Sequence, residues 1–146
     1  HQTFVHILES ASKQDWIAVA GFIRHTLSEI SVQMGHIKEV FLRSDNAGCY
    51  HSGNLWIALT CISQQTGIKI KRYDYSEAQS GKSYCDAKIA HLRRKIRMCV
   101  ANGNNVTTVE EMKQAKNEGL GVAGCQVAVN ADTSELQKVL NYEIFV

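Results

Sequence analysis

Residues 38–53 read KEVFLRSDNAGCYHSG, and this stretch decides how the rest of the chain is interpreted. Residues 40–42 (Val-Phe-Leu) form a continuous apolar run, which predicts a strand covered on both faces. Asp45 follows that strand, and after an Asn-Ala-Gly turn a helix is predicted over residues 53–66. In open α/β sheets, ligands bind outside the carboxyl ends of the strands, where Asp45 lies. The alternative is that Asp45 is an ordinary turn residue, because aspartate, asparagine and glycine tolerate turn conformations.

On both sides of this stretch the sequence alternates between strands and helices, as apolar periodicity and capping signals indicate. This order predicts one α/β domain over residues 1–146, with helices packed on a largely parallel sheet. The seam of the helix after residue 84 is predicted to be Cys85, Ile89, Leu92, Ile96 and Val100. The other expected elements are strands at 3–8, 68–75 and 122–129; helices at 84–102 and from 107 or 108 to 119; a helix opened by a Ser12–Asp15 capping box and ended by Gly35; and a short helix and strand fragment within 134–146.

Composition places the chain among ordinary globular domains. The 146 residues carry a net charge of +2, which does not by itself point to any partner. No stretch reaches the about 20 apolar residues of a membrane helix, so we expect no membrane partner. The five cysteines include no CxxC pair, which favours reduced thiols in a nuclear or cytoplasmic protein. The chain starts with His1 and shows no leader, so we expect it to be a piece of a longer polypeptide.

Residues 41–52 resemble the second-carboxylate strand of ribonuclease H-like transposases and retroviral-type integrases. In that family an aspartate followed by asparagine and a small residue ends the fourth strand and precedes a helix, as at Asp45. Residues 73–77 (YDYSE) and 81–86 (GKSYCD) resemble an element found in transposon-derived proteins of animal genomes. The resemblance covers roughly residues 38–100 and implies a ribonuclease H-like sheet that lacks its first strands.

The resemblance also implies DNA phosphoryl transfer with Mg²⁺ or Mn²⁺, held by three acids. Asp45 matches the second acid. Asp86 and Glu77 are rivals for the third: 40 residues separate Asp45 from Asp86, and 31 separate it from Glu77. We favour Asp86 as the second metal ligand, because a helix holds a side chain's direction better than a loop does. The alternative is that Asp86 only complements the dipole at the start of its helix.

The first acid of this family lies two strands before the first helix, and only one strand is predicted before the first helix here. Asp15 cannot take its place, because its capping position already explains it. We therefore expect this chain alone to be inactive, although its parent would be a metal-dependent nuclease or strand transferase. A catalytically inactive, domesticated transposase core that binds nucleic acid or protein is the alternative function.

Basic residues suggest how nucleic acid would be bound. Lysine and arginine that neutralise phosphates release counterions, which drives binding to DNA. Three tyrosines near them, at 73, 75 and 84, could stack on splayed bases or lie at the edge of the core. The alternative is that these basic residues only form a solvated helix face. The sequence does not show an oligomeric state. The predicted nucleic-acid contacts are Lys82, Lys88, Arg93, Arg94 and Arg97.

A third hypothesis is a nucleotide-binding protein. Residues 76–83 (SEAQSGKS) resemble the phosphate-binding loop G-x-x-x-x-G-K-[ST] and lie between a predicted strand and a predicted helix. Ser76 replaces the first glycine, where the backbone must approach phosphate closely. Cys49 and His51 could suggest a nucleophile and its base, but no third group orients them.

Overall fold

The computed structural model describes residues 2–7, 15–76, 84–119 and 121–129. These residues form two compact units, each with its own helices and its own pair of parallel strands. Each unit is an α/β structure, so the expected α/β class is confirmed.

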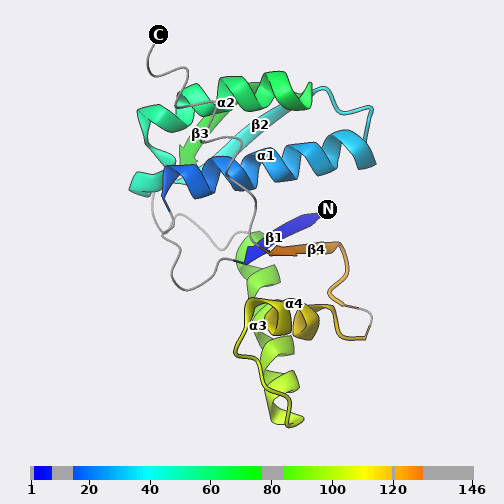
Figure 1. Ribbon diagram of the computed structural model, residues 1–146. Coiled ribbons are helices and arrows are strands. Elements are labelled where there is room, and N and C mark those ends of the chain that lie inside the picture. Colours follow the sequence, from blue (N-terminus) through cyan, green and yellow to red (C-terminus); the bar gives the residue numbers. More distant parts are fainter. Residues whose placement is uncertain (1, 8–14, 77–83, 120, 130–146) are drawn as a thin grey trace. The chain divides into compact units, whose positions relative to one another are not determined.

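The unit within residues 15–76 is built around two parallel strands joined by a helix. Its strands pair along their whole length, and the second helix makes the crossover between them (Figure 1). We call it the β2–β3 unit. In chain order its elements are α1 (Trp16–Gln33), β2 (Glu39–Asp45), the short 3-10 helix η1 (Gly48–Tyr50), α2 (Gly53–Thr66) and β3 (Lys69–Ser76).

Local polar groups and a glycine set the ends of these helices. The Asp15 carboxylate accepts hydrogen bonds from the backbone N–H groups of Ile17 and Ala18, both at 3.0 Å, and so caps α1. The prediction that Ser12 opens this helix is therefore wrong in its capping residue, since the helix begins after Asp15. Gly67 ends α2 with a φ of 69°, a left-handed conformation that glycine adopts without strain.

The core of the β2–β3 unit lies between its two helices and one face of its strand pair. Leu55, Ala58 and Ile62 of α2 have no exposed surface, and Ala20 of α1 packs with them. Figure 1 shows α1 and α2 side by side along the strands. Both helices therefore cover the same face of β2 and β3. The strand and loop residues that complete this core are Val40, Leu42, Cys49, Tyr50, Ile68, Ile70, Tyr73 and Tyr75.

Among the described elements, no helix packs on the other face of the strand pair, which we call the outer face. Phe41 has 71% of its surface exposed, and Arg43 and Asp45 beside it are exposed too. The prediction that β2 is covered on both faces is therefore wrong. The reason is that both helices of this unit pack on the side of Val40 and Leu42.

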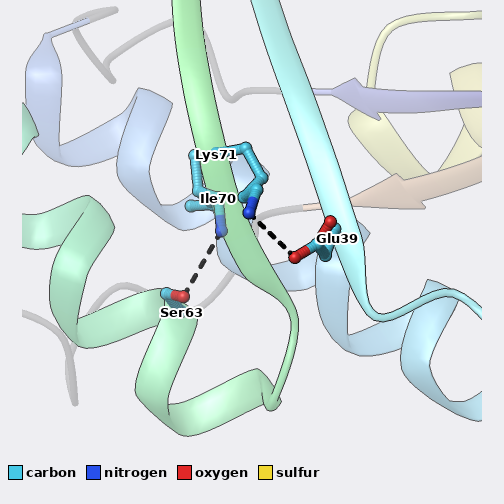
Figure 2. Close-up of polar contacts among 4 residues, drawn as sticks. All are labelled: Glu39, Ser63, Ile70 and Lys71. Carbon is cyan, nitrogen blue, oxygen red and sulfur yellow. Dashed lines mark hydrogen bonds and ion pairs between the residues drawn. The ribbon is translucent and has the colours of Figure 1, made fainter.

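The free edge of β3 is partly capped by α2 (Figure 2). The Ser63 hydroxyl accepts a hydrogen bond from the N–H of Ile70 at 3.4 Å. It also donates one to the carbonyl of Ile68 at 2.9 Å. A bulge follows, because Val40 pairs with Ile70 and Phe41 with Arg72, so that Lys71 has no partner in register. Lys71 instead reaches Glu39 of β2, with 3.0 Å between Nζ and Oε1.

The second unit combines residues 2–7 with 84–119 and 121–129. Its strands pair in parallel from Thr3 opposite Cys125 to Ile7 opposite Val129, and its shorter helix packs against both the longer helix and the second strand. We call it the β1–β4 unit. Its elements are β1 (Thr3–Ile7), α3 (Tyr84–Ala101), α4 (Val109–Asn117) and β4 (Cys125–Val129).

The helix α4 starts with a capping box of Thr108 and Glu111, which agrees with the predicted helix start at residue 107 or 108. The Thr108 hydroxyl accepts from the N–H of Glu111 at 3.1 Å, and the Glu111 carboxylate accepts from the N–H of Thr108 at 3.0 Å. It also accepts from the N–H of Thr107 at 2.8 Å. This reciprocal pair satisfies backbone donors that the first turn of a helix leaves without partners.

The buried seam of α3 differs from the predicted one. Leu92 and Cys99 are buried, but Ile89 is 45% exposed and Val100 is 53% exposed. The side chain of Cys85 lies outside the described residues. The reason is that, among the described elements, α3 packs mainly against one helix, α4. A narrow stripe of α3 is therefore buried rather than its whole apolar face.

The four described strands form two separate two-stranded sheets, not the single sheet that we expected. The helix α2 brings β2 and β3 together locally, whereas β1 pairs with a strand more than a hundred residues away. These strands do not by themselves show a ribonuclease H-like sheet. Apolar periodicity identifies strands but does not assign their partners, which explains the difference.

Candidate functional site

Asp45 is the last residue of β2, at the carboxyl end of a parallel strand pair, as the sequence predicted. Its side chain is exposed on the outer face. One carboxylate oxygen, Oδ1, accepts a hydrogen bond from the N–H of Ala47 at 3.1 Å, which sets the direction of the carboxylate. The second oxygen remains available for a ligand. Ser76, the last residue of β3, lies opposite Asp45 in register.

The turn after Asp45 is held by contacts from β3. The Tyr75 hydroxyl donates a hydrogen bond to the carbonyl of Tyr50 at 2.9 Å, and the His51 ring packs edge-on against Tyr75 with 4.3 Å between centroids. The Ser76 hydroxyl donates to the carbonyl of Ser44 at 3.1 Å. These contacts join the ends of the two strands, so Asp45 stands on a well-supported part of the backbone.

The tyrosines of β3 are structural. Tyr73 is only 8% exposed, and burial raises the pKa of its hydroxyl, an effect that a hydrogen bond with Ser44 partly opposes. Tyr75 is half-buried between Tyr73 and His51. Of the two readings of these residues, the structure favours the edge of the core over base stacking. The side chain of Tyr84 lies outside the described residues.

A second acid shares the outer face with Asp45. Asp74 of β3 lies opposite Arg43 in register, two residues before Ser76, and is therefore diagonal to Asp45. Its carboxylate is paired with Arg72, with 2.6 Å between Oδ1 and Nε. Asp74 is not recognisable as a candidate ligand from the sequence, because only the pairing of β2 with β3 brings the two acids onto one face.

Neither candidate for the third acid lies among the described residues of the β2–β3 unit. Asp86 lies in the first turn of α3, in the β1–β4 unit, whereas Asp45 belongs to the β2–β3 unit. Glu77 lies outside the described residues, as do Lys82 and the rest of the phosphate-loop resemblance after Ser76. Among the described residues, no group of three His, Cys, Asp or Glu side chains could hold a metal ion.

The basic residues of α3, which include four of the predicted nucleic-acid contacts, fall into two groups. The Nζ of Lys88 donates to the carbonyl of Ala123 at 2.8 Å and so ties α3 to the segment before β4; Lys95 does the same to Glu118 at 2.7 Å. Three arginines of the same helix are exposed, as is Asp86, which lies in line with two of them at helical spacing. They are Arg93, Arg94 and Arg97. We call them the α3 arginines.

The comparisons with known proteins yield one family. No curated protein and no solved structure significantly matches the chain. None of the described helices is both long and apolar enough to cross a membrane. The match to the family covers residues 1–143, and so extends across both units. On this evidence the chain belongs to the family described as "Domain of unknown function (DUF8701)".

Proposed function

We propose that this chain is part of a ribonuclease H-like core, of the transposase or retroviral-integrase type, that acts on DNA by Mg²⁺-dependent phosphoryl transfer. The β2–β3 unit supports the proposal. It has the order helix, strand, helix, strand, with parallel strands and an aspartate at the end of the first strand. That order follows the resemblance of residues 41–52, in which the second acid ends a strand and precedes a helix.

The observation that carries the proposal is the geometry of Asp45. Its carboxylate is exposed at the carboxyl edge of two parallel strands, where α/β proteins bind their ligands. The hydrogen bond from Ala47 is to Oδ1, and the residue as a whole is exposed. A turn alone would account for this hydrogen bond but not for the position of Asp45 at the end of β2, opposite the last residue of β3.

The chemistry of Asp45 fits one ligand of a hard cation, since Mg²⁺ prefers carboxylate oxygens. The described residues do not complete a site, because Asp74 is paired with Arg72 and the β2–β3 unit has no third acid at this edge among them. In the proposal, Asp86 or Glu77 supplies the next carboxylate. When bound, the metal would activate the attacking oxygen and stabilise the leaving one.

The test is nicking of supercoiled plasmid DNA in Mg²⁺ or Mn²⁺ by the full-length protein. Loss of even an outer-shell partner of a metal site costs about 10- to 100-fold, so Asp45→Asn is expected to reduce nicking by at least about 100-fold. Glu29→Gln is the matched control. Its carboxylate lies on α1, where it accepts a hydrogen bond from Gln33, and its loss should leave nicking unchanged.

Two further variants would identify which residue is the third acid. Asp86→Asn and Glu77→Gln should differ, and only the variant that removes a true ligand should match the loss caused by Asp45→Asn. Metal-dependent nicking that survives Asp45→Asn would refute the proposal.

A second function, nucleic-acid binding without chemistry, is favoured by the exposed α3 arginines. Exposed guanidinium groups on one helix can neutralise phosphates, and their contribution falls as salt rises. Replacing all three with glutamine should weaken duplex DNA binding and reduce the slope of log affinity against log salt by about 2.7, at about 0.9 for each phosphate contact. Binding that persists while the full-length protein shows no nicking would support this function over the first.

A further inference from the structure

A groove runs between α2 and the free edge of β3, within the β2–β3 unit. It encloses about 440 Å³, which is within the range of sites that bind small ligands or single nucleotides. No described strand pairs with β3 on this side. The residues that line the groove are Trp56, Leu59, Thr60, Ser63, Gln64, Lys69, Ile70, Lys71, Arg72 and Tyr73.

One wall of the groove is basic. Lys69, Lys71 and Arg72 lie close together in β3, with Ile70 between the two lysines. All three basic residues are exposed. Two of them have acidic partners on the outer face: Lys71 with Glu39 at 3.0 Å, and Arg72 with Asp74 at 2.6 Å. Both pairs are open to solvent, and the Arg72 side chain is 69% exposed. Such exposed pairs are weak, so a phosphate could replace the carboxylates.

The opposite wall offers an aromatic side chain. Trp56 of α2 is 47% exposed, and it packs against the buried Tyr73, with 5.7 Å between ring centroids. Tyr73 therefore supports one side of the indole, and the rest of the ring is open to solvent. Exposed aromatic side chains beside cations are a recurring arrangement for unpaired nucleic-acid strands, since every base has a face that can stack.

The backbone of β3 is less available than its side chains. On the free edge Ser63 already accepts from the N–H of Ile70, as Figure 2 shows, and donates to the carbonyl of Ile68. A peptide that adds to a sheet as a further strand needs such backbone groups. The groove is thus better suited to recognition by side chains, through cations and an aromatic ring, than to strand addition.

We propose that this groove binds a single strand of nucleic acid, with phosphates on Lys69, Lys71 and Arg72 and a base stacked on Trp56. The inference rests on the proposed function, because it takes nucleic acid as the partner. It adds a binding surface on the β2–β3 unit to the α3 arginines of the β1–β4 unit. β2 and β3 are parallel, so the aromatic end of the groove, at Tyr73, lies toward the strand ends that carry Asp45 and Ser76. A strand in the groove would run toward that edge.

The first experiment measures fluorescence anisotropy of a labelled oligothymidylate of about 20 nucleotides, long enough for the usual footprint of a strand-binding domain. Stacking on one aromatic side chain corresponds to about a 5- to 150-fold difference in affinity, so Trp56→Ala should weaken binding by at least about fivefold. Ile57→Ala is the matched control, because Ile57 is also 47% exposed on α2 but does not line the groove. It should bind like the unmodified protein.

Fluorescence gives an independent readout of stacking. The chain has two tryptophans, Trp16 and Trp56, so Trp16→Phe leaves the indole of the groove as the only one. Oligothymidylate should quench this emission, and a duplex of equal length should quench it less.

The second experiment tests the basic wall through salt dependence. Lys69→Ala should lower the slope of log affinity against log salt by about 0.7, the value for one phosphate contact in a single strand. Lys38→Ala, an exposed lysine outside the groove, should leave the slope unchanged. Glu39→Gln should strengthen binding several-fold, because it releases Lys71 from its carboxylate partner. A gain of affinity cannot come from damage to the fold.

The outcomes separate this inference from the proposed function. If the groove variants bind like the unmodified protein while nicking still depends on Asp45, the inference fails and the proposed function stands. If no nucleic acid binds at all, both fail. If polyglutamate displaces the oligothymidylate as well as unlabelled oligothymidylate does, the groove recognises acidic chains in general, and the inference is wrong.

Discussion

Single polar side chains that bind the backbone fix much of the local geometry in this protein. Asp15 caps α1, Asp45 holds the N–H of Ala47, and Ser63 covers the edge of β3. Glu111 does the same for two successive N–H groups before α4. Each of these bonds satisfies a backbone group that regular structure leaves without a partner, which is why their sequence positions are informative.

Glu111 should make the stability of α4 depend on pH. Hydrogen bonds from the backbone of Thr107 and Thr108, and from the Thr107 hydroxyl, lower the pKa of its carboxyl group. A group whose pKa is lower in the folded state stabilises it above the unfolded pKa, about 4.3 for glutamate. That contribution is lost as the pH falls through the lowered pKa of the folded state.

We therefore expect Glu111→Gln to lower the thermal midpoint at pH 7 and to lose this effect in acid. Thermal unfolding followed at several pH values, together with amide exchange in α4, would measure it. Glu110→Gln is the control, since Glu110 lies in the same first turn but outside the capping box. Equal effects of the two variants at every pH would contradict the role given to Glu111.

At the scale of elements, the two faces of β2 should differ in their contribution to stability. Leu42 packs against the core, whereas its neighbour Phe41 is 71% exposed on the outer face. Leu42→Ala should lower the free energy of unfolding by about 2 kcal/mol or more, and Phe41→Ala by less than about 1 kcal/mol. Urea denaturation would compare them. A large loss for Phe41→Ala would mean that the outer face is covered in solution.

The edge of β3 offers a second prediction at this scale. Ser63→Ala removes the hydroxyl that satisfies Ile68 and Ile70, and should cost about 1 kcal/mol, the usual net value of one hydrogen bond. The amide of Ile70 should exchange faster. Ser63→Thr keeps the hydroxyl and should restore the slow exchange. Unchanged exchange at Ile70 in Ser63→Ala would show that water replaces the hydroxyl fully.

At the scale of the whole molecule, each unit has its own core, so a core substitution should act mainly within its own unit. Ile62 is fully buried in the β2–β3 unit. Ile62→Val should lower the protection of slow amides in α1, α2, β2 and β3 by about 0.5–1.5 kcal/mol. Protection in α3, α4 and β4 should stay unchanged. Leu92→Ala, in the β1–β4 unit, should give the opposite pattern, and equal losses everywhere would show one cooperative structure.

Elements with strong local signals were predicted from the sequence. The bounds of α2 were predicted as residues 53–66, and the structure confirms them. The prediction was possible because its signals, the apolar face and Gly67, are local in the chain. The start of α4 and the place of Asp45 at the end of β2 were predicted for the same reason. The prediction placed the cap of α1 at Ser12 instead of Asp15, because serine and aspartate both favour a helix start.

The sequence by itself determined the order of strands and helices, because hydrogen bonding within a turn and apolar spacing along a helix are local. Tertiary structure alone decided which strands pair, that Phe41 is exposed, and that Asp74 shares a face with Asp45. It also brought Trp56 and Lys69 to the same groove. These features join residues far apart in the chain, and their energies depend on neighbours that periodicity does not identify.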